Sequence, residues 1–166
     1  MKKSTKKITL TAVLVALAMI LSYVESLIPA FVAVPGVKIG LANTVTVFAL
    51  YIIGRRGALC VSLVRVLLSS LLFGNSVSLM YSLSGALLSF LCMALVMRSS
   101  VFSSVGVSVV GGVMHNAGQI LCAVLVLRTG SVFLYLPALV ISGVIAGIVV
   151  GIIAGLVTER LGRRLR

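Results

Sequence analysis

Three polar side chains stand close together inside an otherwise apolar stretch: His115, Asn116 and Gln119, in the run Gly111-Gly-Val-Met-His-Asn-Ala-Gly-Gln119. On a helix, His115 and Gln119 share a face at a spacing of four residues, and Asn116 is adjacent to Gln119 at a spacing of three. Imidazole and amide groups both donate and accept hydrogen bonds. The stripe fits either a binding site or a contact between helices, and we expect the binding site. Because His115 has no companion His or Cys ligands, we expect no metal there.

Arg65 and Glu25 are the ionisable residues whose positions most need explaining. Arg65 lies near the middle of the apolar run 57–74, and Glu25 stands at the end of an earlier apolar run. The only other carboxylate, Glu159, stands in a basic tail beside Arg160. Charges in an apolar medium are costly unless they are paired. Arg65 could pair with Glu25 or helix carbonyls, or its guanidinium fork could hold a carboxylate or phosphate of a ligand.

The stretch from Glu25 to Asn43 is the least regular part of the sequence. Pro29, Pro35 and Gly36 favour turns, while the residues between them are too apolar for an ordinary solvated loop. We expect this stretch to fold over the remaining structure as a cap, with a simple interfacial loop as the alternative. The candidate substrate-binding residues are therefore Glu25, Lys38, Asn43, Arg65, His115, Asn116 and Gln119.

The elements that must position these residues are membrane helices. Of 166 residues, 61% are hydrophobic and 10% are charged, and the mean hydropathy is +1.30, far above the values of soluble domains. About 20 apolar residues are needed for each crossing of a bilayer. We predict an all-α fold, one transmembrane domain over residues 1–166, with six spans at about 8–24, 39–53, 57–74, 79–97, 104–127 and 132–157. The second span is short, and we expect it to be tilted and shielded by its neighbours.

The distribution of cations predicts the orientation of these spans. The net charge is +12, but Lys and Arg stand at the tips of apolar runs and form no basic face for nucleic acid. With the N-terminus inside, eleven cations fall on the inner side, against Lys38 and Arg128 on the outer side. The inner set is Lys2, Lys3, Lys6, Lys7, Arg55, Arg56, Arg98, Arg160, Arg163, Arg164 and Arg166. We therefore predict that both termini are cytoplasmic.

In this topology the candidate residues lie from the middle of the bilayer to its outer surface. Polar groups at that depth are expensive unless they satisfy one another or a ligand, so we predict one outward-facing pocket. Two cations against one carboxylate favour an anionic or strongly polar small molecule. A vitamin, a quinone precursor or an isoprenoid-related compound would each fit.

Small residues mark two helix-packing faces. Gly143, Gly147, Gly151 and Gly155 recur at intervals of four and form a seam for another helix, in this chain or a partner. Ala12 and Ala16 form a shorter face of the same kind in the first span. Cys60, Cys92 and Cys122 are widely separated and show no metal-binding or redox spacing.

Several of these motifs resemble those of a known bacterial family. The order Glu25-x-x-Ile-Pro29, then Pro35-Gly-x-Lys38-x-Gly-Leu-Ala-Asn43, Arg65 and His115-Asn-x-Gly-Gln119 is similar to the family labelled either Gx transporter or heptaprenyl diphosphate synthase component I. The six-helix length and the Ala12–Ala16 pair also resemble a substrate-binding S-component of energy-coupling factor transporters. This likeness implies a substrate held beneath the first outer loop and a location in the bacterial cytoplasmic membrane.

The two family labels imply different functions. Prenyl-chain synthases of the usual type hold Mg²⁺-diphosphate with aspartate-rich motifs, since hard cations need several oxygen ligands, and this chain has no aspartate. We therefore expect no enzyme activity, no catalytic residue and no cofactor. The S-component likeness implies that Ala12 and Ala16 pack against a coupling subunit, with ATP hydrolysed by partner subunits, because no G-x-x-x-x-G-K-[ST] loop occurs here. The alternative is a non-catalytic accessory or anchoring subunit linked to isoprenoid or quinone metabolism.

Overall fold

The elements of the chain are all helical in the computed structural model, which describes residues 3–27, 41–99 and 101–165. This confirms the predicted all-α class. In chain order the helices are α1 (Lys3–Leu27), α2 (Asn43–Ile52), α3 (Gly54–Phe73), α4 (Ser76–Val96), α5 (Ser104–Leu127), the 3-10 helix η1 (Gly130–Tyr135) and α6 (Leu136–Leu165).

Five of the described helices are long and apolar enough to cross a membrane, as expected of a multi-pass membrane protein. The exception is α2, which has 10 residues and is about 15 Å long, roughly half of a hydrocarbon core of about 30 Å. The predicted second span, 39–53, is therefore too long for this helix. Of its side chains, Val45, Val47 and Leu50 are buried, so the rest of the bundle shields α2.

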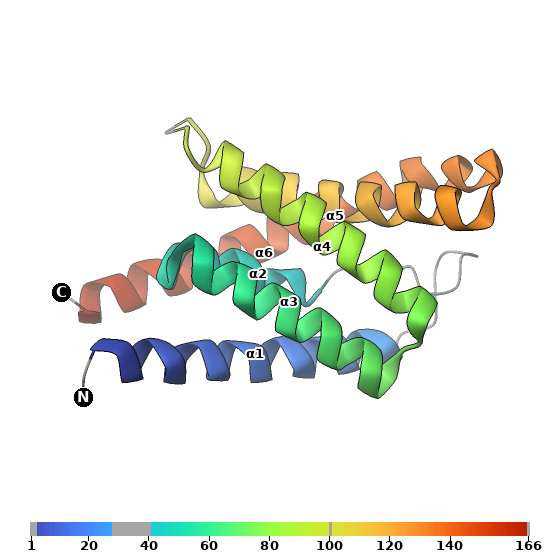
Figure 1. The fold of residues 1–166 in the computed structure, drawn as a ribbon. Coiled ribbons are helices and arrows are strands. Elements are labelled where there is room, and N and C mark those ends of the chain that lie inside the picture. The colour runs from blue at the N-terminus through green and yellow to red at the C-terminus, as the bar shows by residue number, and fades with distance from the viewer. Residues whose placement is uncertain (1–2, 28–40, 100, 166) are drawn as a thin grey trace.

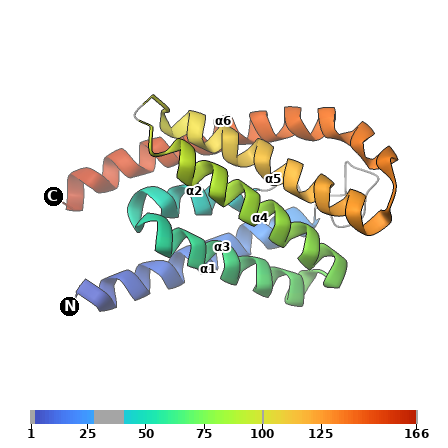
Figure 2. The ribbon, with the colours of Figure 1, turned by 45° about the horizontal axis from the view of Figure 1, so that its top comes forward.

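The helices form two groups, one of α1, α2 and α3 and the other of α4, α5 and α6 (Figures 1 and 2). In the first group α3 packs against both α1 and α2, and in the second α5 packs against both α4 and α6. Contacts of α3 with α4 and of α2 with α6 join the groups. The start of α1 and the end of α6 lie at the same end of the bundle (Figure 1).

A tight turn at Gly54 joins α2 to α3. Gly54 has a φ of +78°, a left-handed conformation that glycine adopts without steric cost. Arg55 and Arg56 follow directly and are exposed. α2 therefore ends at this turn, and its first residue, Asn43, lies at the opposite end of the helix, ten residues long.

The glycine seam of α6 packs against α5. Its partner helix is therefore in the same chain. A methyl group at Gly143 would lie 2.9 Å from the carbonyl carbon of Gly112, and one at Gly147 would lie 2.5 Å from the Cα of Val109. Both neighbours are backbone atoms that cannot move aside. Glycine therefore allows the two helix backbones to touch.

We expect both ends of the chain to be cytoplasmic, because eleven cations fall on the side of the termini and two on the other. Reporter fusions at residue 1 and residue 166, active on only one side of the membrane, should both report the cytoplasm. A fusion after Arg128, in the connection between α5 and η1, is the control and should report the outside. A C-terminal fusion on the outer side would contradict the topology.

Candidate functional site

Six of the seven candidate binding residues lie within the described ranges, and all six side chains are buried: Glu25, Asn43, Arg65, His115, Asn116 and Gln119. The seventh, Lys38, lies outside the described residues. Burial of six polar side chains within an apolar bundle agrees with the expectation that they face inward. The helices nevertheless place them in different surroundings.

Arg65 and Glu25 form the first group, where α1 packs against α3. Arg65 is 3% exposed and Glu25 is 5% exposed, and the Glu25 carboxylate acts electrostatically on the Arg65 guanidinium. The Nε and Nη2 atoms of Arg65 are buried and have no hydrogen-bond partner among the described residues. These two nitrogens form one edge of the guanidinium, and their parallel N–H bonds match the two oxygens of a carboxylate or phosphate.

Buried serines accompany Arg65 and Glu25 on their helices. Ser22 precedes Glu25 by three residues and Ser62 precedes Arg65 by three, so each shares a helix face with the charged residue. The Ser22 and Ser62 hydroxyls are buried without hydrogen-bond partners in the described ranges, as is that of Ser70. Our sequence analysis missed these serines, although their spacing from the charged residues was the available signal.

Asn43 takes part in a chain of hydrogen bonds that connects three helices. Its Nδ2 donates to Ser89 Oγ at 3.0 Å, and Ser89 Oγ donates to the Gly111 carbonyl at 2.8 Å. The chain of bonds connects α2 to α4 and then to α5. Because the Ser89 proton is used on Gly111, Ser89 must accept from Asn43, which fixes the orientation of the Asn43 amide.

His115 and Gln119 face α4, where Gly85 makes room for them. A methyl group at Gly85 would lie 2.7 Å from the His115 carbonyl oxygen and 2.9 Å from Gln119 Cγ. Asn116 faces the opposite neighbour, α6, and donates from Nδ2 to the Leu139 carbonyl at 2.7 Å. The predicted polar stripe of α5 therefore divides between two helices, and Asn116 has a structural hydrogen bond.

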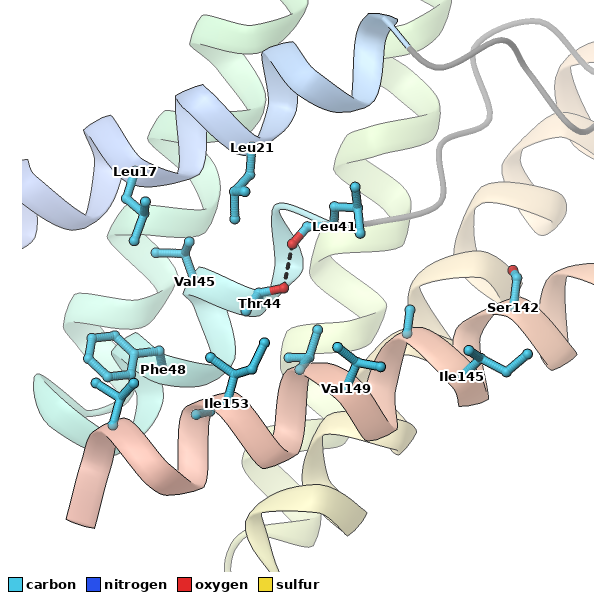
Figure 3. A pocket seen from close by; sticks show the side chains of 14 residues that line it. Leu17, Leu21, Leu41, Thr44, Val45, Phe48, Ser142, Ile145, Val149 and Ile153 are labelled. Carbon is cyan, nitrogen blue, oxygen red and sulfur yellow. Dashed lines mark hydrogen bonds between the residues drawn. The ribbon is translucent and has the colours of Figure 1, made fainter. Parts of the chain in front are cut away.

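Two cavities lie near these residues. The larger, of about 950 Å³, is a groove between α1, α2 and α6 that is lined almost entirely by aliphatic side chains (Figure 3). The smaller, of about 10 Å³, is lined by Asn43, Ser108 and His115 together with Thr44, Gly112, Ala146, Gly147 and Val150. Neither of these two cavities is lined by Glu25 or Arg65. The structure thus brings Asn43 and His115 together, and separately Glu25 and Arg65.

Ala12 and Ala16, the predicted packing face of α1, are both exposed. Their neighbours on the interior side of α1, Leu14 and Ala18, are buried at 2% and 1% exposure. The small-residue face therefore points away from the bundle of this chain, where a helix of another chain could reach it.

Comparison with known proteins gives one match. The model of the family described as heptaprenyl diphosphate synthase component I matches residues 14–157, nearly the whole chain. No curated protein and no solved structure matches. The family match confirms the resemblance that the motifs predicted.

Proposed function

Because the chain belongs to the heptaprenyl diphosphate synthase component I family, we propose that it binds a small molecule within the membrane and hands it to a transport machinery. The ligand carries an anionic or strongly polar group. The chain acts as the substrate-binding component of an importer of the energy-coupling factor type, in the bacterial cytoplasmic membrane. Its α-helical, multi-pass bundle supports this role.

The observation that carries the proposal is that two buried nitrogens of Arg65 have no hydrogen-bond partner among the described residues. A guanidinium at mid-bilayer depth is expensive unless its hydrogen-bonding capacity is used. Glu25 supplies an opposite charge, yet Nε and Nη2 have no hydrogen-bond partner in the part of the chain described. An oxyanion of a ligand would satisfy both nitrogens at once.

Partner subunits supply the energy in this proposal. The exposed face of Ala12 and Ala16 supports a helix contact with a transmembrane coupling subunit. The ATPase subunits are separate chains. Lipid surrounds the remaining exposed apolar surface.

Binding is tested by mass spectrometry of the protein purified in a mild detergent, compared with the Arg65→Gln variant. We expect the wild-type protein to release a small molecule with a carboxylate or phosphate group, and the variant to release none. An accessory or anchoring subunit of isoprenoid or quinone metabolism would instead show the same co-purified compounds in both proteins. That result would favour the structural role of Arg65.

We expect no prenyl-chain elongation by this chain alone, because it contains no aspartate and only two carboxylates with which to hold Mg²⁺-diphosphate. Purified protein given Mg²⁺, an allylic diphosphate and radiolabelled isopentenyl diphosphate should yield no extractable labelled product. A soluble prenyl synthase assayed in the same detergent is the control. Product formed at rates within tenfold of that enzyme would overturn the binding role.

A further inference from the structure

The apolar groove and the small cavity lie next to each other, because Thr44, Ala146 and Val150 line both of them. The small cavity is therefore a polar recess in the wall of the groove, and we keep the name recess for it. From this arrangement we propose that the groove binds a membrane-dissolved molecule with a long apolar body and a single hydroxyl group, which is seated in the recess. This is a second site, separate from Arg65.

The groove itself accepts only an apolar body. Its wall contains two hydroxyls, and both are already used: Thr44 donates to the Leu41 carbonyl at 2.5 Å, and Ser142 donates to the Leu139 carbonyl at 3.0 Å. Along α6 the wall extends from Ser142 to Val157, a rise of about 22 Å. This length suits an extended hydrocarbon chain.

The recess requires a hydrogen-bond donor. The Asn43 amide is oriented with Nδ2 donating to Ser89, and its Oδ1 is buried with no hydrogen-bond partner among the described residues. Asn43 is 5% exposed, so this oxygen is shielded from bulk water. A buried acceptor without a donor is destabilising, and a ligand O–H would remove that deficit.

Ser108 makes the same recess suitable for an acceptor as well. Its hydroxyl is 1% exposed and has no hydrogen-bond partner among the described residues. A ligand hydroxyl can donate to Asn43 Oδ1 and accept from Ser108 Oγ simultaneously. One functional group therefore satisfies both side chains.

Size and charge exclude larger or ionised groups from the recess. Its volume of about 10 Å³ accommodates a single oxygen, the size of one water molecule. No Lys, Arg, Asp or Glu lines it. A carboxylate or phosphate would be too large for this volume, which separates this ligand class from the anion proposed for Arg65.

The ligand enters from the lipid phase. Leu17 on α1 and Ile153 on α6 stand on opposite walls of the groove (Figure 3), and they are 44% and 49% exposed. In a bilayer those surfaces face hydrocarbon. An apolar alcohol dissolved in the membrane therefore reaches the recess without crossing water.

The absence of tryptophan from the chain allows a direct test by fluorescence quenching. Phe48→Trp places one indole in the groove wall, and Leu91→Trp places one on a lipid-facing surface as a control, since Leu91 is 57% exposed. Each protein in lipid nanodiscs is titrated with 9,10-dibromooctadecan-1-ol or with 9,10-dibromooctadecane. We expect the alcohol to quench Phe48→Trp half-maximally at about tenfold lower concentration than the alkane, and no such preference at Leu91→Trp.

Two further changes assign the preference to the recess. In the Phe48→Trp background, Ser108→Ala should reduce the preference for the alcohol by about fivefold. Thr158→Val should leave it unchanged, because Thr158 lines neither cavity and its hydroxyl donates to the Ala154 carbonyl of its own helix at 2.6 Å. Octadecanol without bromine should compete with the brominated alcohol and reverse the quenching, and octadecane should not. Equal quenching by alcohol and alkane, or a preference that survives Ser108→Ala, would overturn the proposal.

Discussion

Leucine at Gly147 is expected to prevent α5 and α6 from packing and to remove most folded protein from the membrane. A Cβ at Gly147 would lie 2.5 Å from the Cα of Val109 and 2.9 Å from its nitrogen. Backbone atoms cannot rotate away as a side chain can, so the helices must separate. Overpacking of this kind typically costs about 1–3 kcal/mol and more where the neighbour is rigid. The folded yield and the thermal midpoint, measured by size-exclusion chromatography after heating, should both fall.

Two other glycines calibrate this experiment. A Cβ at Gly155 would meet only the end of the Ser104 side chain, whose Oγ lies 2.9 Å away, and nothing lies within 4 Å of a Cβ at Gly130. Gly130→Leu should therefore behave as wild type, and Gly155→Leu should be intermediate. If Gly147→Leu and Gly130→Leu had the same thermal midpoint, the close backbone contact between α5 and α6 would be contradicted.

Replacing Arg65 by glutamine is expected to abolish ligand binding and to destabilise the protein at the same time. Two charge-assisted hydrogen bonds to an oxyanion would be lost, which corresponds to a decrease in affinity of at least about a hundredfold. The variant also removes the positive charge on which the buried Glu25 carboxylate acts, and breaking a buried charge pair costs about 3–5 kcal/mol. Uptake of the co-purified compound into cells, together with thermal stability, measures both effects.

Companion variants separate the structural role of Arg65 from its role in binding. Glu25→Gln combined with Arg65→Gln removes both charges and should recover most of the stability without recovering binding. Arg65→Lys keeps the charge but loses the two-pronged geometry, so we expect folded protein with affinity reduced by about tenfold or more. Full uptake by the double variant would show that the pair only supports the fold.

The sequence predicted the long helices well because hydropathy reports directly on transfer into the bilayer. The predicted span 104–127 coincides with α5, and 57–74 differs from α3 by a few residues. The apolar run 8–24 underestimates α1, which begins at Lys3, because a helix can continue into the headgroup region on charged residues. The predicted span 39–53 is longer than α2, because Leu41 and Ala42 satisfy hydropathy but form a turn.

The candidate site was predictable in composition but only partly in arrangement. Burial of Arg65, His115 and Gln119 follows from the cost of exposing polar groups to lipid. Helical periodicity shows which residues share a face, but it cannot show which helix that face meets. For this reason the contact of Asn116 with Leu139 on α6 and the apolar groove, which has no polar sequence signal, became visible only in three dimensions.

The most direct test of the central claim is an experimental structure of the protein in lipid nanodiscs with its co-purified ligand bound. We predict that two oxygens of the ligand's anionic group lie about 2.7–2.9 Å from Nε and Nη2 of Arg65, the distance of charge-assisted hydrogen bonds. Glu25 should remain buried beside the guanidinium. A structure in which both nitrogens bond only to groups of this chain, with the ligand's anionic group elsewhere, would contradict the account.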